Sequence, residues 1–271
     1  MARVRSGIAG CGGRMGRLLT AEVAAADDCT LAAATGRPGS GAVGRDAGIA
    51  AGIAALGVTV SDDPATLFAD SDAVIDFTRP EATLKHAALA AERGTPLVIG
   101  TTGFDADGEA ALAEAARHAP VVLAPNTAAG VNLLFALTER VARALDDAFD
   151  VEIVEIHHRY KVDAPSGTAL ELGRRAARGR GVALDEVADR GRDGETGARL
   201  RGRIGFAALR GGDVVGEHTV VFAGDGERIE LTHRASARAI YARGAVRAVR
   251  WLRGRPPGLY NMFDVLGLSE G

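Results

Sequence analysis

One short segment in the middle of the chain gathers side chains that can carry or exchange protons. Residues 157–168 read HHRYKVDAPSGT, so two histidines, an arginine and a lysine follow the end of a strand predicted at 150–157. Histidine and lysine can titrate near a working pH, which general acid–base chemistry requires. The segment therefore predicts a functional site, against the alternative that His157 and His158 are a satisfied pair at a strand edge.

The same segment then opens a helix with small hydroxyl residues. Ser166, Gly167 and Thr168 offer two O–H groups beside the free N–H groups of a helix start, a geometry that binds carboxylates. Taken alone, Ser166 is better explained as a plain helix N-cap. The two histidines could also ligate a metal, but neighbours on a strand point to opposite faces, so joint ligation is awkward and we expect no metal.

Lysine is rare in this chain. Of 32 basic residues only Lys85 and Lys161 are lysine, and the rest are arginine, as a GC-rich genome would favour. Arginine stays protonated in proteins, whereas lysine can give up a proton. A lysine at 161 therefore favours a site that needs a proton donor or a compact ammonium group, although Lys85 falls on an ordinary predicted helix.

A glycine cluster lies between the first predicted strand (3–9) and the first predicted helix (14–26). Gly10, Gly13 and Gly16 recur every three residues, so the backbone can approach a pyrophosphate while helix N–H groups face the anion. The pattern departs from G-x-G-x-x-G because position 15 is Met and the third glycine comes one residue late. Packing alone could also explain it, but the strand–cluster–helix order favours nucleotide binding.

The second predicted strand (30–35) ends in Thr35-Gly36-Arg37-Pro38, without the carboxylate that usually binds the ribose 2′-hydroxyl. A guanidinium there suits a 2′-phosphate. We therefore expect NADPH to be preferred, with NADH possible, unless Arg37 is only a solvated loop charge.

Strands alternating with helices predict a Rossmann-like, doubly wound parallel sheet in the first half, that is, an α/β fold. Further strands are predicted at 72–77, 96–100 and 120–124, and further helices at 80–92 and 105–118. The segment 36–61, rich in glycine and alanine, is expected to be a mobile excursion.

The pattern changes after residue 129, which predicts a central α+β substrate domain with an open sheet and an antiparallel layout. Its predicted elements are a helix at 131–146, the strand at 150–157, a helix from 166, and strands near 203–210, 214–223 and 227–234, the last two joined by a GDG hairpin. A closing helix (237–253) and the tail 258–268 should return to the first domain. The domains are thus 1–129 with 239–271 for the dinucleotide, and 130–238 for substrate binding and oligomerisation.

Composition narrows the class of protein. The chain has 271 residues, a net charge of −3 and 47% hydrophobic residues, which excludes a generic nucleic-acid binder or a polybasic membrane-surface protein. No apolar run approaches the length of a membrane span and no export signal is visible, so we expect a cytoplasmic protein. Two cysteines, Cys11 and Cys29, are too few for a disulfide framework, a zinc cluster or an iron–sulfur site.

Several motifs together resemble the 4-hydroxy-tetrahydrodipicolinate (dihydrodipicolinate) reductase family of bacterial lysine and diaminopimelate biosynthesis. They are GCGGRMGR at 10–17, DFTRPE at 76–81, VIGTTGF at 98–104, APNTAAGVN at 124–132, EIHHRYKVDAPSGTAL at 155–170 and GDVVGEHTVVFA at 212–223. The resemblance implies NAD(P)H-dependent reduction of 4-hydroxy-tetrahydrodipicolinate to tetrahydrodipicolinate, a mixed sheet in the central domain and a homotetramer.

The resemblance also implies residue roles. His157 would be a proton donor and acceptor and Lys161 a proton donor, with His158, Ser166, Gly167 and Thr168 contacting the substrate. The residues implied for the cofactor are Gly10, Cys11, Gly12, Gly13, Arg14 and Met15 at the pyrophosphate, Arg37 at the adenosine ribose, and Gly100, Thr101, Thr102, Ala124, Pro125, Asn126 and Thr127 on the nicotinamide side.

Two positions depart from the family pattern: Gly36 stands where many relatives carry the acidic ribose ligand, and Thr127 replaces an aromatic residue found in some.

Two rival interpretations remain. One is another two-domain NAD(P) reductase, which would use other catalytic spacings. The other is a cofactor-sensing regulator, which would not need the intact His157, Lys161 and Ser-Gly-Thr set.

Overall fold

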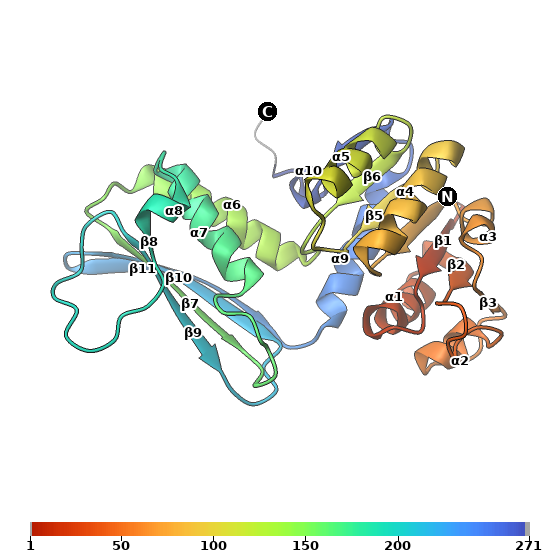
Figure 1. Cartoon of the computed structure of the whole chain (residues 1–271), viewed down its shortest axis with the longest axis horizontal. Coiled ribbons are helices and arrows are strands. Elements are labelled where there is room, and N and C mark those ends of the chain that lie inside the picture. Colours follow the sequence, from red (N-terminus) through yellow and green to blue (C-terminus); the bar gives the residue numbers. More distant parts are fainter. Residues whose placement is uncertain (1, 269–271) are drawn as a thin grey trace. The chain divides into compact units, whose positions relative to one another are not determined.

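The computed structural model describes residues 2–268, which form two compact units. One unit holds the chain up to Ala129 and again from Ala239, and the other holds Gly130–Arg238 (Figure 1). None of the described helices is long and apolar enough to cross a membrane.

The first unit is built on a seven-stranded sheet in which every strand pair is parallel. Its strands are β1 (Val4–Ala9), β2 (Cys29–Thr35), β3 (Val60–Ser61), β4 (Ala73–Asp76), β5 (Leu97–Ile99), β6 (Pro120–Leu123) and β12 (Gly258–Tyr260). Their order is β12-β6-β5-β4-β1-β2-β3, so the direction of winding reverses between β1 and β4. Ligands of open α/β sheets bind outside the carboxyl ends of the strands at such a switch point.

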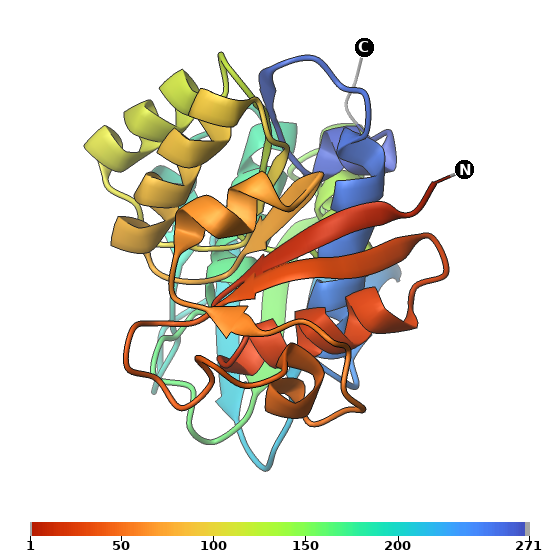
Figure 2. The ribbon, with the colours of Figure 1, turned by 90° about the vertical axis from the view of Figure 1, so that its right-hand side faces the viewer.

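Helices cover both faces of this sheet, which confirms the predicted doubly wound class (Figure 2). The helices are α1 (Arg14–Ala25), α2 (Ala47–Ala51), α3 (Pro64–Ala69), α4 (Pro80–Arg93), α5 (Ala106–Ala115), α9 (Ala239–Leu252) and α10 (Met262–Leu266). Leu19 of α1 and Val249 of α9 pack in the core cluster on one face, while Phe68 of α3 and Leu112 of α5 pack in the cluster on the other. Because both faces of the sheet are buried, the strand sequences are short apolar runs and do not alternate between apolar and polar residues.

The tail returns to the first unit, as predicted. Strand β12 adds to the sheet beside β6, with Leu259 paired to Val121, and α10 follows under a capping box in which Asn261 and Asp264 exchange hydrogen bonds. The segment 36–61, predicted as a mobile excursion, contains helix α2 and strand β3. Asp46 accepts hydrogen bonds from the amides of Gly48 and Ile49, which starts α2, and also from those of Leu56 and Gly57, which closes the loop.

The second unit carries a five-stranded sheet of order β11-β10-β7-β9-β8. Its elements are α6 (Ala129–Ala144), β7 (Asp150–His157), α7 (Gly167–Gly179), α8 (Leu184–Val187), β8 (Ala188–Asp189), β9 (Ile204–Arg210), β10 (Gly216–Gly224) and β11 (Glu227–Ala235). The sheet is mixed, as the resemblance implied: the predicted antiparallel layout holds for β7, β10 and β11, whereas β8 and β9 pair in parallel. Strand β7 is antiparallel to β10 but parallel to β9, because the chain crosses back through α7 before β9 begins. The predicted hairpin is confirmed: β10 and β11 are antiparallel, and Gly226 in their turn has a φ of +85°.

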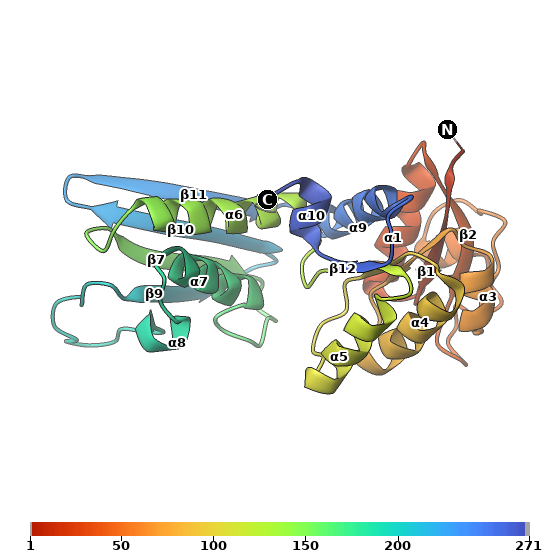
Figure 3. The same ribbon diagram turned by 90° about the horizontal axis from the view of Figure 1, so that it is seen from above.

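Helices α6, α7 and α8 lie on one face of this sheet (Figure 3). The buried residues of β7 fall on alternate positions, Val151, Ile153, Glu155 and His157. Glu155 and His157 each have one polar neighbour on an adjacent strand, His218 of β10 beside Glu155 and Arg210 of β9 beside His157, so this side of the sheet has an apolar half and a polar half. The polar half contains the candidate catalytic residues.

Candidate active site

The glycine cluster forms the turn from β1 into α1. Gly10 has a φ of +70°, which only glycine adopts without strain, and the carbonyl of Gly10 accepts a hydrogen bond from the amide of Gly13. Gly13 is the N-cap of α1 and has no side chain to cap the helix. The first amide groups of the helix are therefore left to face an anion.

Two other glycines of the cluster are required by close packing. A Cβ atom at Gly12 would lie 2.8 Å from the Cβ of Ala42, and one at Gly16 would lie 2.1 Å from the carbonyl oxygen of Gly10. Gly16 thus lets the first turn of α1 pack on the strand end, which is the work of the third glycine in dinucleotide-binding turns. Cys11 is buried beside it, and burial raises the pKa of its thiol to about 11, so it is an inert packing residue.

A cavity of about 810 Å³ opens at the carboxyl ends of β1, β2 and β4, at the switch point of the sheet. Of the predicted cofactor residues it is lined by Gly10, Gly12, Gly13 and Arg37, and not by Cys11, Arg14 or Met15. Sequence analysis missed four further cations that line it: Arg17, Arg45, Arg79 and Lys85. Lys85 therefore lies on the face of α4 that lines the cavity.

The remaining predicted cofactor residues follow the ends of β5 and β6, the next strands in the same sheet. Gly100 is required there, because a Cβ atom would lie 2.2 Å from the ring of Phe77, a cavity-lining residue. The hydroxyl of Thr83 donates to that of Thr101 at 2.9 Å, which ties this loop to α4. Thr102 and Pro125 are exposed, whereas Ala124 is buried.

Thr127 lies in the interior of the first unit. It is 1% exposed, and its hydroxyl donates to the carbonyl oxygen of Tyr241 at 2.7 Å, near the start of α9. Its neighbour Asn126 accepts from the amide of Ala128 through its side-chain oxygen. Thr127 therefore joins the two chain segments that build the first unit, and only its backbone is left to face a ligand.

In the second unit, Glu155 is the centre of the polar cluster. It is 1% exposed, and its two carboxylate oxygens accept four hydrogen bonds. Oε2 accepts from Nδ1 of His157 at 2.5 Å and from Arg210 at 2.8 Å, while Oε1 accepts from Arg210 at 2.8 Å and from the amide of Ser166 at 3.0 Å. Burial by itself raises the pKa of Glu155, but the hydrogen bonds from Arg210 and His157 outweigh it and lower that pKa.

His157 is nearly buried, and its ring packs edge-on against His218 with centroids 5.0 Å apart. Burial lowers the pKa of His157, and the hydrogen bond that His157 donates to Glu155 offsets only part of that shift. Nε2 of His157 faces Gly216, where a Cβ atom would lie only 2.9 Å away. The absent side chain at 216 keeps Nε2 accessible.

Ser166 is the N-cap of α7, as predicted: its hydroxyl accepts from the amide of Ala169 at 3.2 Å. The same hydroxyl lies 3.1 Å from Nε2 of His218, which is buried and whose pKa burial lowers to about 3. Gly167 has open space around its Cα, so a ligand can approach the helix start there. Thr168 follows on the first turn and is half-buried.

The loop after β7 holds Lys161 beside Asp163. The amine Nζ lies 2.7 and 2.9 Å from the two carboxylate oxygens, and its hydrogen bond holds the pKa of Asp163 below its ordinary value. His158 points to the other side of the strand from His157 and lies 3.2 Å from a guanidinium nitrogen of Arg238. The two histidine rings therefore have different protein partners, Glu155 for His157 and Arg238 for His158.

The sequence-predicted residues His157 and Ser166 are thus brought together by Glu155. Sequence analysis missed Glu155, Arg210 and His218. The sequence contained a signal only for Glu155. Side chains of a strand alternate between its two faces, so Glu155 lies on the same buried face as Val151, Ile153 and His157. Arg210 and His218 lie more than fifty residues further along the chain, and only strand register brings them here.

Known proteins resemble this chain over nearly its whole length. Residues 4–127 match the family description "Dihydrodipicolinate reductase, N-terminus", and residues 130–266 match "Dihydrodipicolinate reductase, C-terminus". A 4-hydroxy-tetrahydrodipicolinate reductase from Ruegeria pomeroyi is 59% identical over 96% of this chain and 97% of the relative. Another from Rhodopseudomonas palustris (strain HaA2) is 54% identical over 100% of both chains.

Solved structures share the fold. The dipicolinate-bound dihydrodipicolinate reductase from Paenisporosarcina sp. TG-14 has a TM-score of 0.78 at 24% identity, covering 97% of this chain and 98% of that one. An amine dehydrogenase from Mycobacterium smegmatis has a TM-score of 0.60 at 14% identity, with coverages of 96% and 95%. At these identities the likeness concerns the fold alone.

Proposed function

The chain belongs to the dihydrodipicolinate reductase family, and from that premise we propose how its own residues bind the reactants and move the protons. It is an oxidoreductase with 4-hydroxy-tetrahydrodipicolinate reductase activity, a step of lysine and diaminopimelate biosynthesis. The family uses NAD(P)H, which supplies one hydride when it is bound. The substrate is a cyclic imine that carries two carboxylates.

The cavity at the switch point fits a dinucleotide in shape and charge. The turn Gly10–Met15 would hold the pyrophosphate, because the glycines leave room and the uncapped start of α1 attracts an anion. Arg37 would meet the adenosine ribose at the end of β2. The loops Gly100–Thr102 and Ala124–Thr127 would line the nicotinamide side, since β5 and β6 lie on the other side of β4 in the sheet.

The choice between the two cofactors depends on the end of β2. Five cations line the cavity, Arg17, Arg37, Arg45, Arg79 and Lys85, against two carboxylates, Asp62 and Glu81. No acidic side chain stands at Gly36, where a carboxylate would repel a 2′-phosphate and bind a 2′-hydroxyl. This excess of positive charge supports a preference for NADPH, with NADH still accepted.

The start of α7 and the loop before it would bind the substrate carboxylates. Gly167 lies in open space at the first turn, and Ser166 and Thr168 flank it with hydroxyl groups. Lys161 would supply positive charge to the second carboxylate from the loop after β7, with His158 as a further contact. Each of these contacts recognises an anion, which suits a ring with two carboxylates.

Lys161 and His157 would move the protons. Hydride is delivered to ring carbon C4 after or with loss of the C4 hydroxyl group as water. The electron pair of the unsaturated ring then moves toward the ring nitrogen and C3, so a proton has to arrive at that part of the ring. The ammonium group of Lys161 can give up one proton, whereas His157 offers an accessible Nε2 beside a carboxylate that stabilises its protonated form. We assign Lys161 as proton donor and His157 as proton donor and acceptor.

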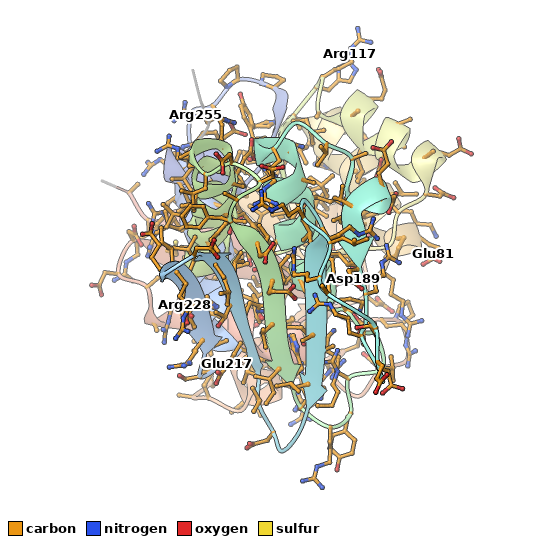
Figure 4. All side chains as sticks on the ribbon, turned by 90° about the vertical axis from the view of Figure 1, so that its left-hand side faces the viewer. Glu81, Arg117, Asp189, Glu217, Arg228 and Arg255 are labelled. Atoms are coloured by element: carbon orange, nitrogen blue, oxygen red, sulfur yellow. The ribbon has the colours of Figure 1, made fainter. Side chains whose placement is uncertain are left out.

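The central sheet also supports the assembly into a homotetramer. The face of the sheet away from α6 and α7 carries apolar side chains in its middle strands, Val154, Ile156 and Val221, beside Leu209, which is 52% exposed. Charged pairs edge this face, including Glu217 with Arg234; Glu217 and Arg228 lie on the neighbouring strands β10 and β11 (Figure 4). An apolar centre with a charged rim suits contact with a second copy of the chain.

The observation that carries this assignment of residues is that one buried carboxylate, Glu155, joins His157 to the start of α7. The activity is tested by following NADPH and NADH consumption with substrate generated enzymatically in the same cuvette. Turnover with both cofactors and a higher kcat/KM for NADPH are expected. Tight NADPH binding without any turnover would instead favour a cofactor sensor.

A further inference from the structure

We propose that Glu155 is a positioning residue that sets the tautomer of His157 and, at the same time, holds the first residue of α7 in place. The inference rests on the proposed roles of His157 and of the α7 start, and it adds a group that couples them. Glu155 touches neither reactant in this account. It acts through His157 and Ser166.

The argument begins with the hydrogen-bonding capacity of the carboxylate. An ionised carboxylate has about four acceptor positions and no donor. Glu155 fills all four with partners: two come from Arg210, one from the amide of Ser166 and one from His157. Since Arg210 and the amide can only donate, the carboxylate has no proton of its own to give to His157.

It follows that Nδ1 of His157 is the donor in the 2.5 Å contact with Oε2. In the neutral ring the proton is then on Nδ1, and Nε2 carries the lone pair on the side of Gly216. The reverse tautomer would set a ring lone pair against a carboxylate oxygen at that distance. Glu155 therefore directs the reactive nitrogen of His157 toward the space that Gly216 leaves open.

The other oxygen of Glu155 controls the helix. Its contact with the Ser166 amide fixes the residue whose hydroxyl caps α7 and lies 3.1 Å from His218. Arg210 extends the arrangement to the loop, because the guanidinium group that binds Glu155 also donates to the carbonyl oxygen of Asp163 at 2.6 Å. The ion pair between Glu155 and Arg210 thus fixes the positions of His157, the start of α7 and the loop that carries Lys161 relative to one another.

The charges around His157 determine the effect of removing Glu155. Arg210 of β9 and Lys161 of the loop each disfavour a positive imidazole, whereas Glu155 favours it; His218 of β10 packs against the ring as a buried neutral group. Loss of the carboxylate should therefore lower the pKa of His157 further.

The test is Glu155→Gln, followed by ¹⁵N spectra of the histidine rings with His157→Gln to assign the signal. In the wild type we expect the neutral His157 ring to carry its proton on Nδ1. In Glu155→Gln we expect the proton to move to Nε2 or the two tautomers to mix, the titration of His157 to shift to lower pH, and kcat to fall about 100-fold. Glu155→Asp, which keeps the charge, should recover part of kcat.

The matched control is Glu139→Gln, which also removes a largely shielded carboxylate paired with an arginine, Arg175, but on α6 and α7. It should leave the His157 tautomer, its titration and kcat unchanged. A kcat within twofold of wild type in Glu155→Gln, with the Nδ1–H tautomer retained, would overturn the inference while leaving the proposed function intact. If Glu155→Gln does not fold, the wild-type spectrum still decides, because an Nε2–H tautomer at neutral pH contradicts the inference.

Discussion

The amine of Lys161 lies 2.7 and 2.9 Å from the two carboxylate oxygens of Asp163, so the proposed proton donor is held by a carboxylate two residues away. The Asp163 side chain is 55% exposed, which leaves it free to swing away. A substrate carboxylate could then take its place on the ammonium group. The pair keeps Lys161 oriented before the substrate arrives.

Lys161→Arg should lose most of kcat, by about 100-fold or more, although the positive charge remains. Arginine keeps its proton, so it can bind a carboxylate but cannot act as an acid. Steady-state kinetics with the native substrate measure the effect. Arg159→Lys, a charge-conserving change at an exposed position of the same loop, is the control and should keep its kcat. Near-wild-type turnover of Lys161→Arg would refute the role of proton donor.

Gly216→Ala should lower kcat about tenfold or more while the protein stays folded. The added methyl group would lie 2.9 Å from Nε2 of His157, and Glu155 prevents the ring from moving away. Gly211→Ala is the matched control, since a Cβ atom there meets nothing within 4 Å. Equal kinetics for the two variants would show that Nε2 is not the reactive nitrogen.

Arg37→Ala should reduce kcat/KM for NADPH about 10- to 100-fold and leave kcat/KM for NADH nearly unchanged. A hydrogen bond to a charged group at the ribose phosphate is worth about 1.5–3 kcal/mol, and NADH has no phosphate at that position. Parallel assays with the two cofactors measure the ratio. A wild-type enzyme that uses both cofactors equally well would remove the basis of this prediction.

Stability should fall as the pH drops from about 6.5 toward 3, partly because of His218. Its pKa is about 3 in the fold, below the unfolded value, so between these values the unfolded chain binds a proton that the folded chain does not. The contribution of His218 to the free energy of unfolding is therefore fully present above about pH 6.5. About 2 kcal/mol of it is lost by pH 5.

Chemical denaturation of His218→Gln at pH 7.5 and 5 measures this contribution. The variant should lose less stability on acidification than the wild type does. His118→Gln, at a side chain that is 60% exposed, should behave like the wild type. The same pH dependence in His218→Gln and wild type would mean that His218 is not buried as a neutral ring.

Local patterns predicted the parts of the site that are contiguous in sequence. The glycine turn, the strand ending at His157 and the helix starting after Ser166 each lie within a few residues, so spacing alone places them. The α/β pattern of the first unit and the returning tail were predicted for the same reason: short apolar strands alternate with helices whose ends are marked by caps.

Contacts made through strand pairing could not be predicted this way. Whether β9 runs parallel or antiparallel to β7 depends on the crossover through α7, and only that pairing sets Arg210 opposite His157. The antiparallel register of β10 likewise places His218 opposite Glu155. The position of Lys85 at the cavity could not be predicted either, because the face of α4 that lines the cavity is defined by the sheet beneath it and not by the helix sequence.

The most direct test of the central claim compares wild type with His157→Gln in one assay of NADPH consumption, together with NADPH affinity measured by calorimetry. The account predicts unchanged affinity, because the cofactor residues lie in the first unit, and a kcat reduced about 100-fold or more, because the proton-exchanging nitrogen is gone. A kcat within a few-fold of wild type would contradict the assignment of acid–base catalysis to the cluster around Glu155.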